Sequence, residues 1–499
     1  MMLLGRSIPW FRAGSTRCGV SRAGKRVAKA CVASLAACLL FAPKTASAAD
    51  SILGDRADFG GSYGRMGIGW VKTGQVGGGL YMNIVSHNAI GGRLEEGDYL
   101  EPWMRLHLLK KSDDPDALQV DVQSSFEAFS TGAGLLGDIA NGDTATIKLF
   151  PEQAYVEAKN VFTPGLSFWM GSRLYRTNDV HIADYFYFNK NVGNGVGVKY
   201  ANKKLGEAEF VVMQTTSGSS FFKYDLNQNP TSPNFVYRPR TEFILQYKLP
   251  LGFGTSFVQT MLQYHVVPRS QNEVAQSPAN VNPPDWGVVG GAKIHVDLTG
   301  ENFSDTSIRF GNRIANGAEG GGQTYQTFGI ETAEGTYKGA YGIEFVEHFN
   351  ANIKDIVGIN GYFTAHYSHG ATNVEPMAPG TRDPNTCSEA SCANSRGDYA
   401  IGVRPIFYIA DQFHIVTEAT YSMRKDDQQK AGTLVKLNIA PTIVPLGGRS
   451  VWSRPHLRLI YSVGFYNQAA REQLMSSFLT TVGDTKVAHY LGARTEWWF

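Results

Sequence analysis

The chain has 499 residues, with 46 Lys and Arg against 44 Asp and Glu, so its formal net charge is +2. The eight bases in the first 48 residues leave 38 for the rest, which then carries a net charge of −6. This balance gives no indication of nucleic acid as a partner. Glycine (55 residues) and aromatic residues (12%) are abundant, which is typical of turn-rich β architecture with rings at a membrane interface.

Residues 1–48 are predicted to be an export signal that is cleaved, which leaves 49–499 as one domain. A basic front is followed by an apolar run over 30–42 and by the small-residue pattern Ala46-Ser47-Ala48. The run is too short to span a bilayer as a helix, and no other stretch approaches its length. A membrane protein with this sequence must therefore be a closed barrel, because an open sheet leaves backbone groups unpaired in lipid.

Two of the five cysteines, Cys387 and Cys392, follow the signal and lie close together in a polar stretch. In an exported protein this spacing predicts a small disulfide loop. A metal site would need more ligands nearby, so we expect neither a metal nor another cofactor.

Apolar and polar residues alternate along the mature chain with a period of two, as in strands that have one lipid-facing side. At the first strand Met66, Ile68 and Trp70 share one face. The same pattern recurs over 99–108 and 457–465. It recurs again in the last stretch, where Leu491, Ala493, Thr495, Trp497 and Phe499 oppose Tyr490, Gly492, Arg494, Glu496 and Trp498. An edge strand of a soluble sandwich is the alternative for this terminal stretch taken alone.

The predicted fold is an all-β, transmembrane antiparallel barrel with short periplasmic turns and long extracellular loops. About 450 mature residues, at about 25 for each strand and connection, predict sixteen to eighteen strands. A barrel of that size encloses an aqueous channel. The protein is therefore expected in the bacterial outer membrane, in contact with its lipid.

The polar face must line the channel, because charged side chains at the bilayer midplane are costly. It carries these charged residues: Arg65, Arg93, Glu101, Arg454, Arg458, Arg494 and Glu496. It also carries four large rings: Tyr63, Tyr99, Trp452 and Trp498. Rings beside charges suit a solute with apolar faces and hydroxyl edges, and sugars have this form. Each ring taken alone is equally well explained as part of an aromatic girdle at the rim.

Several stretches resemble the maltoporin family of sugar-specific outer-membrane porins. The most specific is 171–188, Gly-Ser-Arg-Leu-Tyr-Arg-Thr-Asn-Asp-Val-His-Ile-Ala-Asp-Tyr-Phe-Tyr-Phe. Residues 58–70, 401–405, 450–455 and the Trp-Trp end are similar too, in the same order along the chain, whereas 201–400 and the loops match poorly. The resemblance implies an eighteen-stranded barrel, usually a homotrimer with three separate channels.

The resemblance also implies roles for individual residues. Tyr63, Tyr99, Trp452 and Trp498 fall on positions of an aromatic path, the greasy slide, and Phe303 matches more loosely. Five residues fall on polar-track positions: Arg65, Arg93, Glu101, Asp179 and Asp184. Phe186 stands at the constriction, where the family has a Tyr, and Thr177 stands where it has a track Arg. His181 and Arg173 match the motif without an implied role, and the slide Trp contributed by a neighbouring subunit has no clear counterpart. Because Thr177 lacks the forked guanidinium donor of the track Arg, we expect a substrate preference other than maltodextrin.

Three functions follow from these patterns. The first is facilitated diffusion of maltose- or maltodextrin-like carbohydrates through a trimeric channel. The second is a general diffusion porin for ions and small hydrophilic solutes. The third is a surface-binding protein that uses the loop around Cys387 and Cys392 for adhesion or phage docking. An enzyme is not expected, because no Ser or Cys nucleophile motif accompanies the acid–His–acid cluster of Asp179, His181 and Asp184.

Overall fold

The structure is a computed structural model, and it describes residues 56–71, 74–76, 82–84, 91–95, 97–109, 111–130, 147–176, 178–215, 223–225, 235–269, 283–317, 326–372, 393–427 and 429–498. These residues belong to one compact unit, Asp55–Phe499. The predicted signal (1–48), Thr177, Cys387, Cys392 and Phe499 lie outside the described residues.

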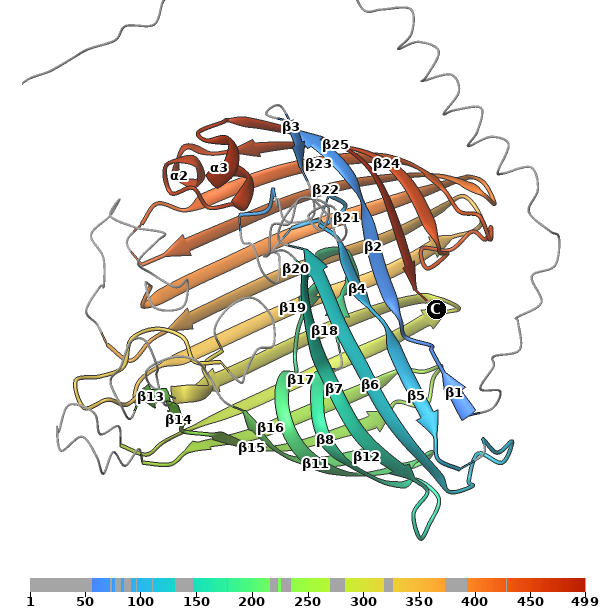
Figure 1. Cartoon of the computed structure of the whole chain (residues 1–499), viewed down its shortest axis with the longest axis vertical. Helices are drawn as coiled ribbons and strands as arrows, with labels where there is room; N and C mark the ends of the chain where they lie inside the picture. Colours follow the sequence, from blue (N-terminus) through green and yellow to red (C-terminus); the bar gives the residue numbers. More distant parts are fainter. Residues whose placement is uncertain are drawn as a thin grey trace, which may run out of the picture. The chain divides into compact units, whose positions relative to one another are not determined.

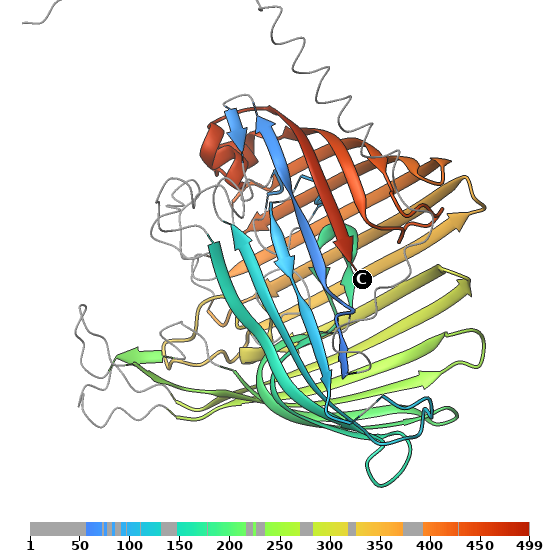
Figure 2. The ribbon, with the colours of Figure 1, turned by 45° about the vertical axis from the view of Figure 1, so that its right-hand side comes forward.

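The unit is a closed, antiparallel barrel of eighteen strands, counted over the described residues (Figures 1 and 2). In chain order the wall strands are β2 (Tyr63–Val71), β4 (Tyr99–Glu101) with β5 (Trp103–His107) as one strand, β6 (Gln119–Ser130), β7 (Ile147–Lys159), β8 (Leu166–Arg176), β11 (Lys190–Asn202), β12 (Gly206–Thr215), β15 (Arg240–Pro250), β16 (Phe257–Val267), β17 (Asp285–Thr299), β18 (Asn302–Asn312), β19 (Tyr341–Ile353), β20 (Val357–His369), β21 (Ser395–Ala410), β22 (Phe413–Asp426), β23 (Gly432–Ile443), β24 (His456–Tyr466) and β25 (Val487–Trp498).

The remaining elements are short. They are the strands β1 (Ala57–Asp58), β3 (Gly74–Val76), β9 (Asp179–Val180), β10 (Tyr185–Phe186), β13 (Lys223–Asp225) and β14 (Phe235–Tyr237), the 3-10 turns η3 (His181–Ala183) and η5 (Arg313–Ala315), and the helices α2 (Gln468–Glu472) and α3 (Ser477–Val482). Within the described residues no helix is long and apolar enough to cross a membrane.

The first and last wall strands close the barrel. β2 pairs with β25 from Tyr63 opposite Trp498 to Trp70 opposite Leu491, and it pairs on its other side with β4. Closure leaves no free sheet edge, which is the condition for a β protein in lipid. The predicted all-β barrel with about eighteen strands is thereby confirmed.

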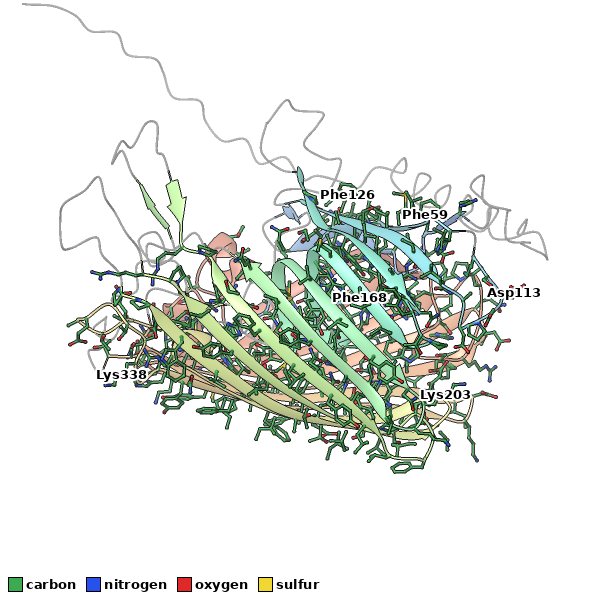
Figure 3. All side chains as sticks on the ribbon, turned by 90° about the horizontal axis from the view of Figure 1, so that it is seen from below. Phe59, Asp113, Phe126, Phe168, Lys203 and Lys338 are labelled. Atoms are coloured by element: carbon green, nitrogen blue, oxygen red, sulfur yellow. The ribbon has the colours of Figure 1, made fainter. Side chains whose placement is uncertain are left out.

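The two faces of the wall differ as the alternation predicts. On β24 and β25 the outward Leu459 and Leu491 are about half exposed, whereas the inward Arg458, Arg494 and Glu496 are buried. Apolar side chains such as Phe168 project from the outer wall (Figure 3). The outer wall is therefore suited to lipid and the inner wall to polar solutes.

Glu347 is an exception on the outer wall. It stands midway along β19 between the outward Phe345 and Phe349, and its carboxylate accepts hydrogen bonds from the Ser304 and Thr306 hydroxyls of β18. These two donors satisfy the carboxylate within an otherwise apolar belt, so that its cost in lipid is reduced.

The two ends of the barrel differ in their connections. Short links such as 203–205 and 354–356 define what we call the turn end, and longer ones such as 313–340 define the loop end. Asp113 and Lys203 mark the first end and Lys338 the second (Figure 3). This asymmetry is typical of outer-membrane barrels, whose turn end faces the periplasm.

Candidate functional site

One segment, residues 178–189, crosses the interior of the barrel and is called here the inner loop. It forms a small hairpin, β9 with β10, joined by η3. Five of its side chains are almost fully buried: Val180, Ala183, Tyr185, Tyr187 and Phe188. Apolar side chains in the middle of a water-filled barrel are stable only because the loop packs against the inner wall.

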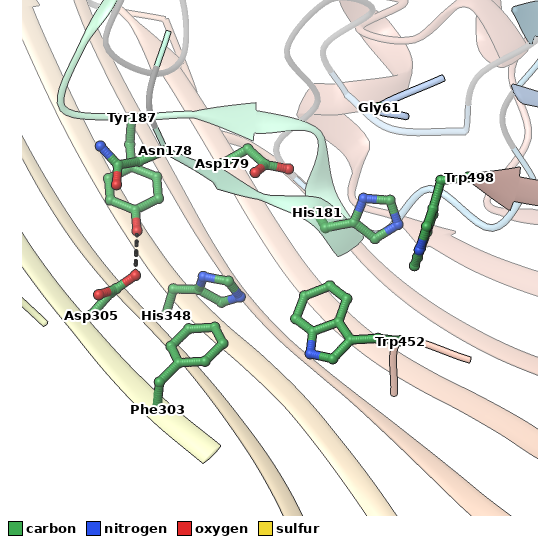
Figure 4. A pocket seen from close by; sticks show the side chains of 10 residues that line it. All are labelled: Gly61, Asn178, Asp179, His181, Tyr187, Phe303, Asp305, His348, Trp452 and Trp498. Carbon is green, nitrogen blue, oxygen red and sulfur yellow. Dashed lines mark hydrogen bonds between the residues drawn. The ribbon is translucent and has the colours of Figure 1, made fainter. Parts of the chain in front are cut away.

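Two carboxylates on the opposite wall bind residues 185–188 of the inner loop. Glu344 of β19 accepts the Tyr185 hydroxyl and the Phe188 amide, both at 3.1 Å. Asp305 of β18 accepts the Tyr187 hydroxyl at 3.2 Å (Figure 4). Hydrogen bonds to charged acceptors are the stronger class, so this anchoring fixes the loop at one height in the channel.

Other contacts hold the tip of the inner loop, around η3. Arg93, from the inward segment 91–95, forms an ion pair with Asp184 at 2.5 Å, and Arg404 of β21 donates to the Ile182 carbonyl at 3.4 Å. Burial alone would raise the pKa of the Asp184 carboxyl, but the charge and hydrogen bond of Arg93 outweigh burial and hold that pKa below its ordinary value. The pair therefore ties the inner loop to a second inward segment.

Four rings form a continuous row on neighbouring strands of the inner wall. The ring centroids are 5.9 Å apart for Tyr99 and Tyr63, 6.4 Å for Tyr63 and Trp498, and 6.3 Å for Trp498 and Trp452. All four are half-buried. The structure thus brings together the four rings that the resemblance singled out, and their arrangement offers a sugar successive apolar faces.

Charged groups border this row. Glu496 accepts the Tyr63 hydroxyl at 3.0 Å and Nε of Arg454 at 2.9 Å, and it also accepts a hydrogen bond from Arg458. The Arg454 guanidinium stands 3.8 Å from the centre of the Trp498 ring. The row is therefore held by buried ion pairs that also place donors and acceptors at the ring edges.

His181 belongs to the same group, although sequence reasoning assigned it no role. Its ring meets Trp498 edge-on at 4.9 Å and lies within 6.4 Å of Tyr63 and Trp452, and its Nε2 is 3.3 Å from Glu496. The residue brings the tip of the inner loop against the ring row, so it narrows the passage there.

A cavity of about 580 Å³ lies between the inner loop and the wall of the barrel. Trp452 and Trp498 line one side of it, and Phe303 and His348 line the other (Figure 4). Phe303 contacts His348 at 5.2 Å and His295 at 5.8 Å, and no described ring contact joins it to Trp452. Phe303 therefore faces the row across the cavity.

Phe186 of the inner loop lies under two cations. The Arg176 guanidinium stands 4.3 Å, and the Lys190 ammonium 4.8 Å, from its ring centre. Arg176 also donates to both oxygens of Glu101, at 3.2 and 3.3 Å. Thr177 lies outside the described residues, so the loss of a track Arg at that position stays a prediction. Its neighbour Arg176 supplies a donor to Glu101 here.

The other predicted polar-track residues occupy different surroundings. Arg65 lies over the Tyr99 ring at 5.2 Å and donates to the Gly97 carbonyl, and Asp179 lines the cavity. Glu101 bridges Tyr99 and Arg176, whereas Arg93 and Asp184 bind each other. Arg65, Glu101 and Asp179 thus border the passage. Arg93 and Asp184 instead join the inner loop to segment 91–95.

The wall near Phe186 includes residues that sequence reasoning did not select: Glu127 of β6, Glu152 of β7, Arg176 and Lys190. Lys190 is directly opposite Arg176 in the sheet, and Arg176 is 4.0 Å from Glu152. Glu127 continues the inward alternation of β6, so that pattern could have found it, whereas Glu152 is the extra residue of β7 at the register shift opposite 125–126. No group of three or more metal-ligating side chains occurs in the described part of the chain.

A closed barrel with an apolar outer wall, a polar interior and a loop folded across that interior defines an outer-membrane porin. The model of the LamB porin family matches residues 58–499, and the chain belongs to that family. This places the protein in the bacterial outer membrane, as the sequence predicts, and implies a channel rather than an enzyme.

Similar known proteins share little sequence identity with this chain. A maltoporin from Photobacterium profundum is 28% identical over 138 residues, which span 27% of this chain and 30% of that protein. Among solved structures, OpdL of Pseudomonas aeruginosa has a TM-score of 0.40 at 8% identity and covers 88% of this chain and 97% of its own. OmpF of Salmonella typhi in complex with daunomycin has a TM-score of 0.38 at 10% identity and covers 89% and 98%.

Proposed function

We propose that this porin facilitates the diffusion of maltose- and maltodextrin-like carbohydrates. The row of Tyr99, Tyr63, Trp498 and Trp452, bordered by ion-paired donors and acceptors, carries the proposal. Adjoining rings on a water-filled wall are not needed for the passage of an ion or a small polar solute. The C–H faces of a sugar pack on such rings, and its hydroxyls reach the donors and acceptors at the ring edges.

Phe186 acts as the constriction in this proposal. Its ring has no hydroxyl, so Arg176 and Glu101 beside it bind the hydroxyls of the sugar in its place. A sugar chain would slide along the row, present its hydroxyls to these groups, and enter the cavity in front of Phe303. We further propose a homotrimer with three channels, on the ground of family membership, and cleavage of residues 1–48 on export.

Current block in a planar bilayer tests the sugar proposal. Addition of maltohexaose, sucrose and glucose in turn should block most strongly with maltohexaose, because it covers the most rings. Trp498→Ala should weaken maltohexaose binding about fivefold, which corresponds to the loss of about 1 kcal/mol of ring contact. Trp70→Ala, a change of an outward-facing Trp on β2, is the matched control and should leave the block unchanged.

The alternatives give different results. If no sugar blocks and the conductance is large, the protein is a general diffusion porin for ions and small solutes. If deletion of the loop around Cys387 and Cys392 abolishes adhesion or phage binding and leaves sugar flux intact, surface binding is a separate function.

A further inference from the structure

Arg173 stands on the inner wall of β8 with its guanidinium over three rings. The distances to the ring centres are 4.7 Å for Tyr155, 4.7 Å for Trp169 and 5.3 Å for Tyr175. The three rings are buried and Arg173 is only half-buried. Within the described residues, this guanidinium has neither an ion pair nor a hydrogen bond. Its planar fork is therefore held rigidly, and its N–H groups remain available on the channel side.

A second set of donors adjoins it. Gln123 of β6 lies directly opposite Tyr155 of β7, is 1% exposed, and accepts two hydrogen bonds from Arg105 at 3.2 and 3.0 Å. Its amide nitrogen has no partner in the described part of the chain. Arg105 and Arg173 both lie within electrostatic range of the Tyr155 hydroxyl. The Gln123 amide nitrogen is shielded from the channel, so Gln123 acts by holding the Arg105 guanidinium through its amide oxygen.

The nearby acids are already engaged. Asp121 contacts His107 at 2.7 Å, Glu157 contacts Lys159 at 3.2 Å, and Glu209 accepts the Tyr175 hydroxyl at 2.6 Å. Arg105 keeps only a long contact of 4.0 Å with Asp121. The patch of Arg105, Gln123 and Arg173, called here the donor patch, is therefore rich in donors and poor in competing acceptors.

The donor patch lies between the constriction and the turn end. On the wall strand made of β4 and β5, Arg105 is four residues nearer the turn end than Glu101, and on β8 Arg173 is three residues nearer it than Arg176. A solute that has passed Phe186 thus meets these donors before it leaves the channel.

We propose that the donor patch is a subsite for a carboxylate carried by a sugar, so that the channel binds sugar acids more tightly than the neutral sugars of the same length. A carboxylate is planar and accepts paired hydrogen bonds from a guanidinium fork. The inference rests on the proposed function in that it takes the carrier to be a sugar.

The test compares maltohexaose with maltohexaonate, in which the reducing-end glucose is an open chain whose C1 is oxidised to a carboxylate, by current block of the full-length native porin at low ionic strength. Low salt is chosen because salt screens the attraction. The acid should bind about tenfold more tightly than the neutral sugar when it is added at the turn end. The preference should shrink as the salt concentration rises.

Variants locate the effect. Arg173→Gln and Arg173→Lys should each remove most of the acid preference, because the first loses the charge and the second loses the fork, and neither should change maltohexaose binding more than about twofold. Arg449→Gln, a change of an exposed arginine in the turn-end connection before β24, should retain the preference. Heat-modifiable mobility on gels and conductance in salt alone check that each variant forms a barrel.

The outcomes separate the two proposals. If maltohexaose blocks and maltohexaonate blocks no better, or if the acid preference survives Arg173→Gln, the carboxylate subsite is refuted and sugar transport stands. If only the acid blocks, in a manner that depends on Arg173, the subsite stands and the neutral-sugar proposal fails. If neither blocks, both proposals fail.

Discussion

Replacement of Glu344 by Ala should open the constriction. Glu344 is 1% exposed on β19, and its two oxygens accept the Phe188 amide and the Tyr185 hydroxyl at 3.1 Å each. A hydrogen bond to a charged acceptor contributes about 1.5–3 kcal/mol, so the substitution removes about 3–6 kcal/mol of anchoring. Even the lower figure raises the ratio of open to closed inner loop about 150-fold.

Single-channel recording measures this effect. Glu344→Ala should give a larger conductance, more open-channel noise and a weaker maltohexaose block than the native porin, because Phe186 is no longer held across the passage. Glu344→Gln should stay close to native, since the amide oxygen can accept from Phe188 and the amide nitrogen can donate to the Tyr185 oxygen. Glu347→Gln, on the outward side of the same strand, is the matched control.

The reasoning would be refuted by a Glu344→Ala channel with native conductance, noise and sugar block in a properly folded barrel. That result would mean that the contacts of Asp184 and Tyr187 hold the inner loop by themselves.

Three further predictions concern other parts of the channel. The pKa of Asp184 is lowered, so its pair with Arg93 stabilises the closed loop above the ordinary carboxyl value of about 4 and is lost as the pH falls through the lowered value. Channel noise should rise at acid pH, whereas Asp184→Asn should be noisy at neutral pH and insensitive to acid. Phe186→Tyr should strengthen maltohexaose block about threefold by adding a hydroxyl at the constriction, and an unchanged affinity would show that this ring does not touch the sugar. Glu347→Leu should raise the free energy of unfolding in lipid by about 1 kcal/mol, as measured by urea titration, because it removes a carboxylate from the apolar belt; a loss of stability would contradict a lipid-facing position.

The faces of the strands were predictable from local sequence. Leu459 and Leu491 point outward and Arg458 and Glu496 inward, as the alternation predicts, because side chains along a strand alternate strictly and the two faces meet lipid and water. A register shift in β7 interrupts this rule at the inward Glu152, whereas Glu127 follows the alternation of β6 and was not selected. The alternation placed the four rings on the channel side, but only the resemblance to a family joined them into one path, because Tyr63 and Trp498 lie at opposite ends of the chain and become neighbours through closure.

The sequence by itself therefore determined the class of fold, the membrane-facing surface and many of the residues that line the channel, because these depend on a two-residue period and on the cost of charge in lipid. Only the tertiary structure decided what narrows the channel. The inner loop is placed by contacts such as Tyr185 with Glu344, which are 159 residues apart, and by Arg176 stacking on Phe186. No local pattern encodes such pairings, since they exist only once the wall has closed and brought distant strands to the same height.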